Sequence, residues 1–157
     1  MTGAASSPAA VARKAGFRAR VEGRLLVQEI DGRWSAGDAE KAVGEWFRIG
    51  AERDRPLGLL ACQNDAMASG ARKALLRVAT GSGRRDLHRT PVIGCDGLEE
   101  EGRAMVARGE LEATVVMPPT TPVALEVLRR FWETGERAEA VALEPESYPS
   151  LDALVRR

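Results

Sequence analysis

The fold of this chain is decided by the stretch LGLLACQNDAMASGARKALLRV, residues 57–78. Its first part, 57–62, is too short and too uniformly apolar for a strand with one face in water, so it predicts a buried strand of a parallel sheet. Asn64 or Asp65 can then cap a helix over 66–78. A buried strand followed at once by a capped helix is the repeating unit of α/β folds.

The same alternation continues on both sides of this stretch. It predicts an α/β fold with a mainly parallel sheet and helices on both of its faces. Residues 80–90 are polar and contain glycine, so we expect a loop there. The chain opens with a helix, whereas such a fold ordinarily opens with a strand. Strands are expected at 25–30, 57–62, 91–95, 112–117 and 140–143, and helices at 9–22, 36–51, 66–78, 98–108, 122–134 and, as a turn or two, 150–155.

Composition excludes several classes of function. The chain has 157 residues, which suits one domain, and its 23 Lys+Arg balance its 23 Asp+Glu. With no basic excess to neutralise phosphates, we expect no direct contact with nucleic acid. No apolar run approaches the ~18–20 residues that span a bilayer.

Motifs for catalysis, metals and cofactors are missing from the sequence. Cys62 and Cys95 cannot make a disulfide framework or a four-thiolate zinc site, and we expect both to be small buried strand residues. His88 is the single histidine and lies in the predicted loop. No P-loop, nucleotide-binding glycine motif or nucleophile elbow is present. We therefore expect no cofactor, no metal and no catalytic residues.

Polar residues that directly follow the predicted strands are the candidates for binding, because ligands of open parallel sheets bind at the carboxyl ends of the strands. Together they provide an indole, amides and carboxylates. Amides and carboxylates bind hydroxyl groups, and an indole can cover the C–H face of a ring, so the set suits a small polyhydroxylated molecule. These residues are Asp31, Trp34, Gln63, Asn64, Asp65, Asp96 with Gly97, and Met117.

Each candidate also has a purely structural interpretation. Asn64 or Asp65 serves as a helix cap, Asp96-Gly97 as a tight turn, and Asp31 as a turn residue. Trp34 fits equally well as a core residue at the start of a helix. Arg13, Arg18 and Arg20 share one helix and would ordinarily form a solvated face.

Three motifs, in order along the chain, carry a family resemblance: CQNDAMASGA at 62–71, PVIGCDG at 91–97 and GELEATVV at 109–116. They resemble the sugar-binding type I periplasmic binding proteins of ABC importers, which are related in fold to the effector domains of lactose-repressor-like regulators. Upstream, Ser7 with RKAGF at 13–17, and DGRWS at 31–35, are similar to further segments of that family. The likeness covers nearly the whole chain.

The resemblance implies a set of ligand-binding residues. Asn64 and Asp96 match positions that hydrogen-bond sugar hydroxyls, Trp34 an aromatic that packs on the sugar ring, and Arg13 an arginine that donates to ligand oxygens. Met117 matches a ligand-contacting position that is often glutamine, and a thioether cannot replace the hydrogen bonds of an amide. Trp34, Asn64 and Asp96 are also selected by the argument from strand ends.

The resemblance also accounts for the helical opening. Family members have two α/β lobes with the ligand between them, and this chain matches the second lobe only. The likeness begins at Thr2-Gly3, just after the first strand of that lobe in the family. We therefore expect residues 1–157 to form a single partial domain, a three-layer αβα lobe lacking its first strand and its partner lobe. Residues 118–139 are the crossover segment that would pack on that partner lobe.

The expected function is half of a solute-binding protein for a sugar or polyol, not an enzyme, with an ABC permease as partner of the intact parent. The alternative is the effector-binding half of a lactose-repressor-like regulator. The segment 113–116, which resembles the importer branch, and the lack of basic excess favour the first. A small α/β enzyme using Asp65 or Asp96 as a base lacks any accompanying nucleophile or cofactor motif.

Two further expectations concern location and self-association. The parent would be periplasmic, but residues 1–10 lack the features of a signal peptide, so the chain expressed as written would stay in the cytoplasm. Helix 122–134 carries large apolar side chains that would face the partner lobe. Either the helix folds back on its own lobe or two chains form a homodimer through it, and we expect the homodimer.

Overall fold

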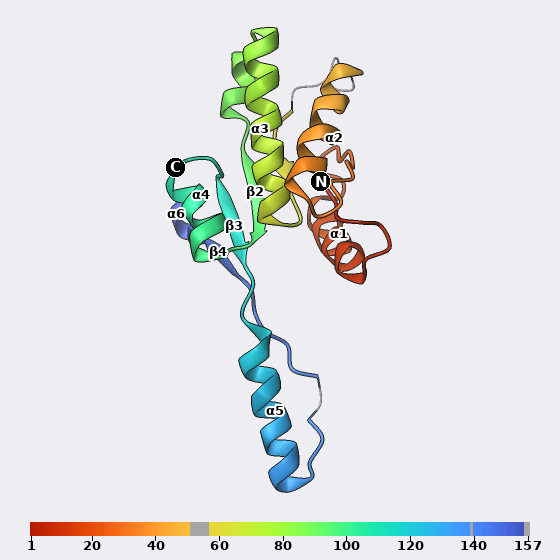
Figure 1. Ribbon diagram of the computed structural model, residues 1–157, viewed down its shortest axis with the longest axis vertical. Helices are drawn as coiled ribbons and strands as arrows, with labels where there is room; N and C mark the ends of the chain where they lie inside the picture. The colour runs from red at the N-terminus through yellow and green to blue at the C-terminus, as the bar shows by residue number, and fades with distance from the viewer. Residues whose placement is uncertain (51–56, 139, 156–157) are drawn as a thin grey trace.

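The computed structural model describes residues 1–50, 57–138 and 140–155. Figure 1 shows a body built around a sheet, from which one helix, α5, projects together with the segment that returns to the sheet. Among the described residues, none of the helices combines the length and apolarity needed to cross a bilayer. The helices are α1 (Pro8–Val21), α2 (Ala36–Arg48), α3 (Asp65–Ser82), α4 (Ala104–Ala107), α5 (Thr120–Thr134) and α6 (Leu151–Val155), with a 3₁₀ turn η1 (Arg85–Arg89) and a π turn η2 (Glu99–Arg103).

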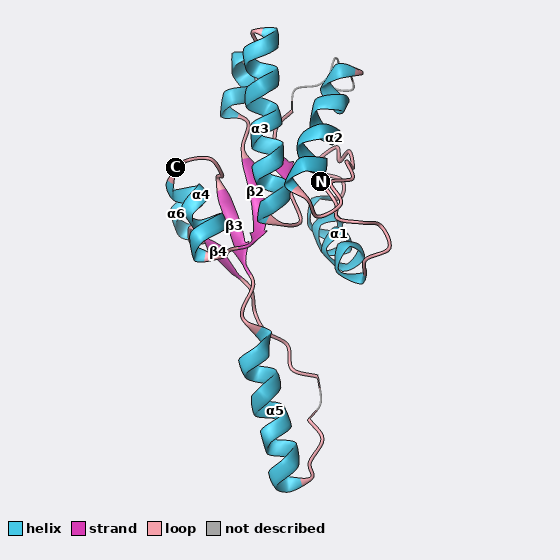
Figure 2. Ribbon diagram, viewed as in Figure 1, coloured by secondary structure: helices cyan, strands magenta, loops and turns pink. Residues whose placement is uncertain are grey.

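The sheet is mainly parallel, as the sequence predicts (Figure 2). Its strands are β1 (Leu60–Ala61), β2 (Val92–Asp96), β3 (Ala113–Val116) and β4 (Glu146–Tyr148), in that order across the sheet. β1, β2 and β3 run parallel, and β4 pairs antiparallel with β3. The carboxyl ends of three strands therefore share one edge.

The core forms where α2 and α3 pack on each other and on the parallel strands. Val43 of α2, and Met67 and Leu75 of α3, are fully buried. At Gly70 the two helices approach so closely that an added Cβ would lie 1.9 Å from the carbonyl oxygen of Ala36. Glycine is required there by the close approach of two backbones.

The predicted starts of the helices at 9–22 and 36–51 are confirmed to within one residue, and Ser7 and Ser35 cap these two helices. The Ser7 hydroxyl accepts from the Ala10 amide, and the Ser35 hydroxyl from the Asp38 amide, so each satisfies a free N–H of the first turn. The expected end of the second helix, at residue 51, lies outside the described residues.

The predicted loop at 80–90 is wrong. α3 continues to Ser82, and residues 85–89 form a 3₁₀ turn. The hydroxyls of Thr80 and Ser82 bond to carbonyls one turn earlier, so these polar residues fit inside a helix. Leu87, which is fully buried, anchors the turn to the core.

The predicted strand at 25–30 is also wrong: it is replaced by a single parallel bridge between Thr2 and Asp31. The Thr2 amide donates to the Ile30 carbonyl at 2.9 Å, and the Gly32 amide to the Thr2 carbonyl at 2.8 Å. A strand needs a hydrogen-bonding neighbour along its length, and within the described residues this segment has that ladder only at its carboxyl end. Leu25 and Leu26 are accordingly exposed.

The strand predicted at 140–143 lies elsewhere, at 146–148. Ala140 and Val141 line a cavity of about 430 Å³ beside α5, in the segment that projects from the body. The returning chain reaches the sheet only at β4, where Thr114 pairs with Tyr148. An apolar run alone does not reveal where along a returning segment the sheet begins.

Candidate functional site

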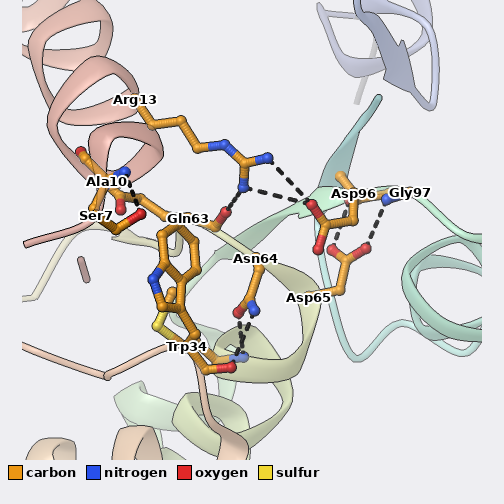
Figure 3. Close-up of polar contacts among 11 residues, drawn as sticks. Ser7, Ala10, Arg13, Trp34, Gln63, Asn64, Asp65, Asp96 and Gly97 are labelled. Carbon is orange, nitrogen blue, oxygen red and sulfur yellow. Dashed lines mark hydrogen bonds and ion pairs between the residues drawn. The ribbon is translucent and has the colours of Figure 1, made fainter. Parts of the chain in front are cut away.

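The predicted binding residues lie at the carboxyl end of the parallel strands, and Figure 3 shows four of them, Arg13, Trp34, Asn64 and Asp96. Asn64 follows β1, Asp96 is the last residue of β2, and Met117 follows β3. Arg13 reaches this end from α1, and Trp34 lies in the turn before α2.

Arg13 contacts three other residues of the cluster. Its guanidinium donates to the Gln63 carbonyl and, from both Nη atoms, to Oδ1 of Asp96 at 3.4 Å. It also lies over the Trp34 ring, 5.6 Å from the ring centre, within the range of a cation–π contact. The side chains of Arg13 and Asp96 are 29% and 42% exposed, so solutes can reach both partners. The interpretation of Arg13 as part of a solvated face is therefore wrong.

Trp34 owes its placement to an unusual turn. Arg33 and Trp34 have positive φ values of 49° and 65°, in the left-handed region that non-glycine residues seldom adopt. The Asp31 carboxylate accepts from the Arg33 amide at 3.0 Å and stabilises the turn, so Asp31 is the turn residue that the sequence suggested. The half-buried indole lies against Gly3, where an added Cβ would be 2.0 Å from the ring.

Asn64 serves as the cap of α3. Its Oδ1 accepts from the Met67 amide at 2.8 Å, and its Nδ2 donates to the Trp34 carbonyl at 3.1 Å. One amide hydrogen of the side chain remains beyond these two bonds. The capping interpretation is therefore confirmed for Asn64, which also links α3 to the turn that carries Trp34.

Asp96 closes the cluster on the side of β2. Its φ is 115°, and Gly97 follows with φ 68°. Partial burial raises the pKa of the Asp96 carboxyl, and the Arg13 guanidinium opposes that rise. Met117 lies beside Asp96 through the backbone, since its amide donates to the Asp96 carbonyl at 3.1 Å, and its side chain is partly exposed.

Gln63 was not among the predicted ligand residues, although it stands in the strand-end set. Its side chain accepts from the Gly3 amide and donates to the Ala10 carbonyl, both at 2.9 Å. Gln63 thus ties the start of the chain and α1 to the end of β1. Its position directly after an apolar strand was the signal available in the sequence.

The chemistry of the cluster is that of a neutral polar site. One guanidinium and one carboxylate lie at its centre, so their formal charges cancel, and an indole borders them. Hydroxyl groups both donate and accept, which matches this pair, whereas a charged solute would leave one charge unbalanced. Among the described residues, no group of three or more His, Cys, Asp or Glu side chains could hold a metal ion.

Comparison with solved structures identifies the fold. The chain matches the fructose-binding periplasmic domain of a hybrid two-component system with a TM-score of 0.75 and 24% identity, over 93% of this chain and 47% of that one. It matches the arabinose-binding protein of a Shewanella sp. ANA-3 ABC transporter with a TM-score of 0.74 and 19% identity, over 100% and 52% of the two chains. For a Bacillus halodurans ABC transporter solute-binding protein with bound myo-inositol, the TM-score is 0.75 and the identity 19%, over 99% and 52%.

The structural neighbours are thus sugar-binding periplasmic binding proteins, and this chain has the fold of one half of such a protein. It spans about half the length of the structures it matches. No protein-family model matches the sequence, and no curated protein does.

Proposed function

We propose that this chain is the sugar- or polyol-recognising half of a solute-binding protein that serves an ABC importer. The observation that carries the proposal is the meeting of Arg13, Trp34 and Asp96 at the carboxyl end of the sheet. This end is where open α/β sheets bind ligands. The neighbours, by their descriptions, bind fructose, arabinofuranose and myo-inositol, which are all uncharged polyols.

The proposed roles follow from the chemistry of each group. Arg13 donates hydrogen bonds to sugar oxygens, and Asp96 accepts them from sugar hydroxyls. The Trp34 indole covers the C–H face of the ring. Asn64 contributes its remaining amide hydrogen, and Met117 adds an apolar contact beside Asp96. An arriving sugar competes with the Arg13–Asp96 ion pair for both partners.

We further propose that the chain acts without catalysis, as one side of a two-lobed site. Two lobes that close on a ligand exclude water from it and share its hydrogen bonds. The parent would lie in the periplasm and present its closed form to an ABC permease. Residues 1–157 are the partial domain, and 118–139 the crossover segment to the other lobe. One neighbour belongs to a two-component system, so a sensor is the second candidate, and adjacent permease or kinase genes would separate the two.

The direct test is a nuclear magnetic resonance titration of the chain with fructose, arabinose, allose and myo-inositol. We expect saturable shifts at the Trp34 indole N–H and the Asp96 and Gly97 amides. The dissociation constant should be about millimolar or weaker, because each missing hydrogen bond to a buried polar group costs ~1–3 kcal/mol. If none of the sugars causes saturable shifts at these groups, the proposal is wrong. A micromolar dissociation constant would contradict the expectation that one lobe alone binds weakly.

We also propose that the chain self-associates through α5. In the described structure α5 has no buried residue and projects from the body, so it does not fold back on its own sheet (Figure 1). Large apolar side chains left in water favour a partner surface. The side chains concerned are Leu125, Leu128, Phe131 and Trp132.

A further inference from the structure

Asp65 is a buried carboxylate next to the site. Its residue is only 2% exposed, and it begins α3 directly after the Asn64 cap. Its Oδ1 accepts from the Thr114 hydroxyl of β3 at 2.6 Å, and its Oδ2 from the Gly97 amide at 2.7 Å. One side chain thus joins a helix, a neighbouring strand and the turn that follows β2 (Figure 3).

The backbone closes tightly around this carboxylate. An added Cβ at Gly94 would lie 2.0 Å from Oδ1, and one at Gly102 would lie 2.1 Å from Oδ2. β2 and η2 can approach Asp65 so closely only because both positions lack a side chain. The carboxylate therefore has little freedom to move away from Gly97.

Gly97 is held from its other side as well. Nε of Arg103 donates to the Gly97 carbonyl at 3.0 Å, and the Arg103 guanidinium lies 5.6 Å from the centre of the Tyr148 ring. Both backbone groups of Gly97 are thereby bound, the amide by Asp65 and the carbonyl by Arg103.

The turn that these contacts hold contains a strained residue. Asp96 has a φ of 115°, which side-chain-bearing residues rarely adopt, and such a conformation persists only where the surroundings impose it. The strain has a visible result, because in this conformation the Asp96 carboxylate faces Arg13.

We propose that Asp65 is a positioning residue for the site: by holding the Gly97 amide it keeps Asp96 at positive φ, with its carboxylate directed toward Arg13. The importance of this for ligand binding rests on the proposed function, whereas the effect on Asp96 can be measured without a ligand.

The test compares three variants by nuclear magnetic resonance of the ligand-free chain. In Asp65→Ala the Gly97 amide loses its acceptor, so its hydrogen exchange should speed up at least about tenfold, as for the loss of one buried hydrogen bond. The HN–Hα coupling of Asp96 should move toward that of an extended residue. Asp65→Asn should preserve both values, since its Oδ1 still accepts from Gly97 while its Nδ2 donates to Thr114.

Thr114→Val is the matched control, because it removes the other hydrogen bond of the same carboxylate. If Asp65 had only a structural role, Thr114→Val and Asp65→Ala would change the HN–Hα coupling of Asp96 equally. If Asp65 positions Asp96, Thr114→Val should leave that coupling unchanged. A folded Asp65→Ala variant with an unchanged Asp96 coupling would overturn the inference, as would equal effects of the two variants.

If Asp65→Ala does not fold, the wild-type chain decides the matter. A scalar coupling across the hydrogen bond, between the Gly97 nitrogen and the Asp65 side-chain carbon, is expected, and its absence would overturn the inference. A chain that binds no sugar but shows these effects would refute the proposed function alone. Sugar binding with an unchanged Asp96 in Asp65→Ala would refute this inference alone.

Discussion

The guanidinium of Arg13 lies 3.4 Å from the carboxylate of Asp96, although 83 residues separate them in the chain. The contact joins α1 to the end of β2 and places both groups beside the Trp34 indole. Partly exposed ion pairs contribute little to stability, commonly below about 1 kcal/mol. The value of this pair to the protein therefore lies in placing two complementary groups at the carboxyl end of the sheet.

Arg13→Met should separate binding from stability. The free energy of unfolding should fall by less than about 1 kcal/mol, because the pair is partly screened by solvent. The sugar-dependent shifts of the Trp34 indole should disappear. Arg18→Met is the control, since Arg18 pairs with Glu29 on the exposed side of the same helix. Denaturant unfolding and the sugar titration measure the two effects, and loss of binding in the control alone would contradict the assignment.

Asn64 can be tested as a cap and as a ligand group at once. Asn64→Ala should lower the free energy of unfolding by about 1–2 kcal/mol, because the Met67 amide loses its acceptor. Asn64→Ser should keep most of that stability, since serine is also a good cap. Both variants should weaken sugar binding if the amide contacts the ligand. Equal destabilisation by serine and alanine would show that the bond to the Trp34 carbonyl, and not the cap, dominates.

Local patterns were enough to predict the two central parallel strands and the starts of the first two helices. β2 and β3 are short apolar runs that find each other in parallel register, and Ser7 and Ser35 cap the helices that follow them. The segment 25–30 has the same apolar character, but its ladder depends on a neighbouring strand, and Thr2 provides only the last pairing. Strand propensity cannot reveal whether such a neighbour is present.

The site was predictable to the extent that strand ends define it. Asn64, Asp96 and Met117 lie at or just after the carboxyl ends of parallel strands, so their common edge could be inferred from the order of elements alone. The position of Arg13 depends on how α1 packs, which no local pattern encodes, and only the family resemblance pointed to it. Asn64 caps α3 through a local bond to the Met67 amide, whereas the role of Asp65 arises from tertiary contacts with Gly97 and Thr114, which local sequence does not reveal.

Both cysteines should be inert in the folded chain. Burial raises the pKa of the Cys62 thiol to about 12 and also raises the pKa of Cys95, so little thiolate exists at neutral pH. Dithiobisnitrobenzoate at pH 8 should react with neither thiol before unfolding and with both in denaturant. Rapid reaction of Cys95 in the native chain would indicate that the turn after β2 opens readily.

The pH dependence of stability should report the burial of Asp65. Burial raises its folded-state pKa above the ordinary 3.8, and the nearby Asp96 and Glu101 add to the rise. The folded state therefore takes up a proton more readily than the unfolded state between the raised pKa and 3.8. As the pH falls through this window, the wild type should gain stability relative to Asp65→Asn, and the difference should level off below it.

The free energy of unfolding of Asp65→Asn must be subtracted from that of the wild type, because several surface carboxylates change stability with pH in the opposite direction. Glu29 and Glu110, for example, have pKa values lowered by hydrogen bonds from arginines, so both proteins lose their contribution on acidification. Urea unfolding at a series of pH values gives the difference. If the wild type instead loses stability relative to Asp65→Asn as the pH falls, the folded state stabilises the charged form of Asp65 and the argument from burial is wrong.

The exposed apolar side of α5 leads to the last prediction. Leu125, Leu128 and Trp132 follow one another at helical spacing and are 59%, 43% and 75% exposed. Burying each large apolar side chain contributes about 1.5–3 kcal/mol, so covering several outweighs the entropic cost of pairing two chains at micromolar concentration. Light scattering should therefore give about twice the 16.9 kDa mass of one chain.

The double variant Leu128→Lys with Trp132→Lys should give the mass of a single chain, because two charges of each chain then face the contact. Val155→Lys, at an exposed apolar residue outside α5, is the control and should behave as the wild type. A wild-type mass of one chain at tens of micromolar, a range set by ordinary weak association, would refute self-association through α5.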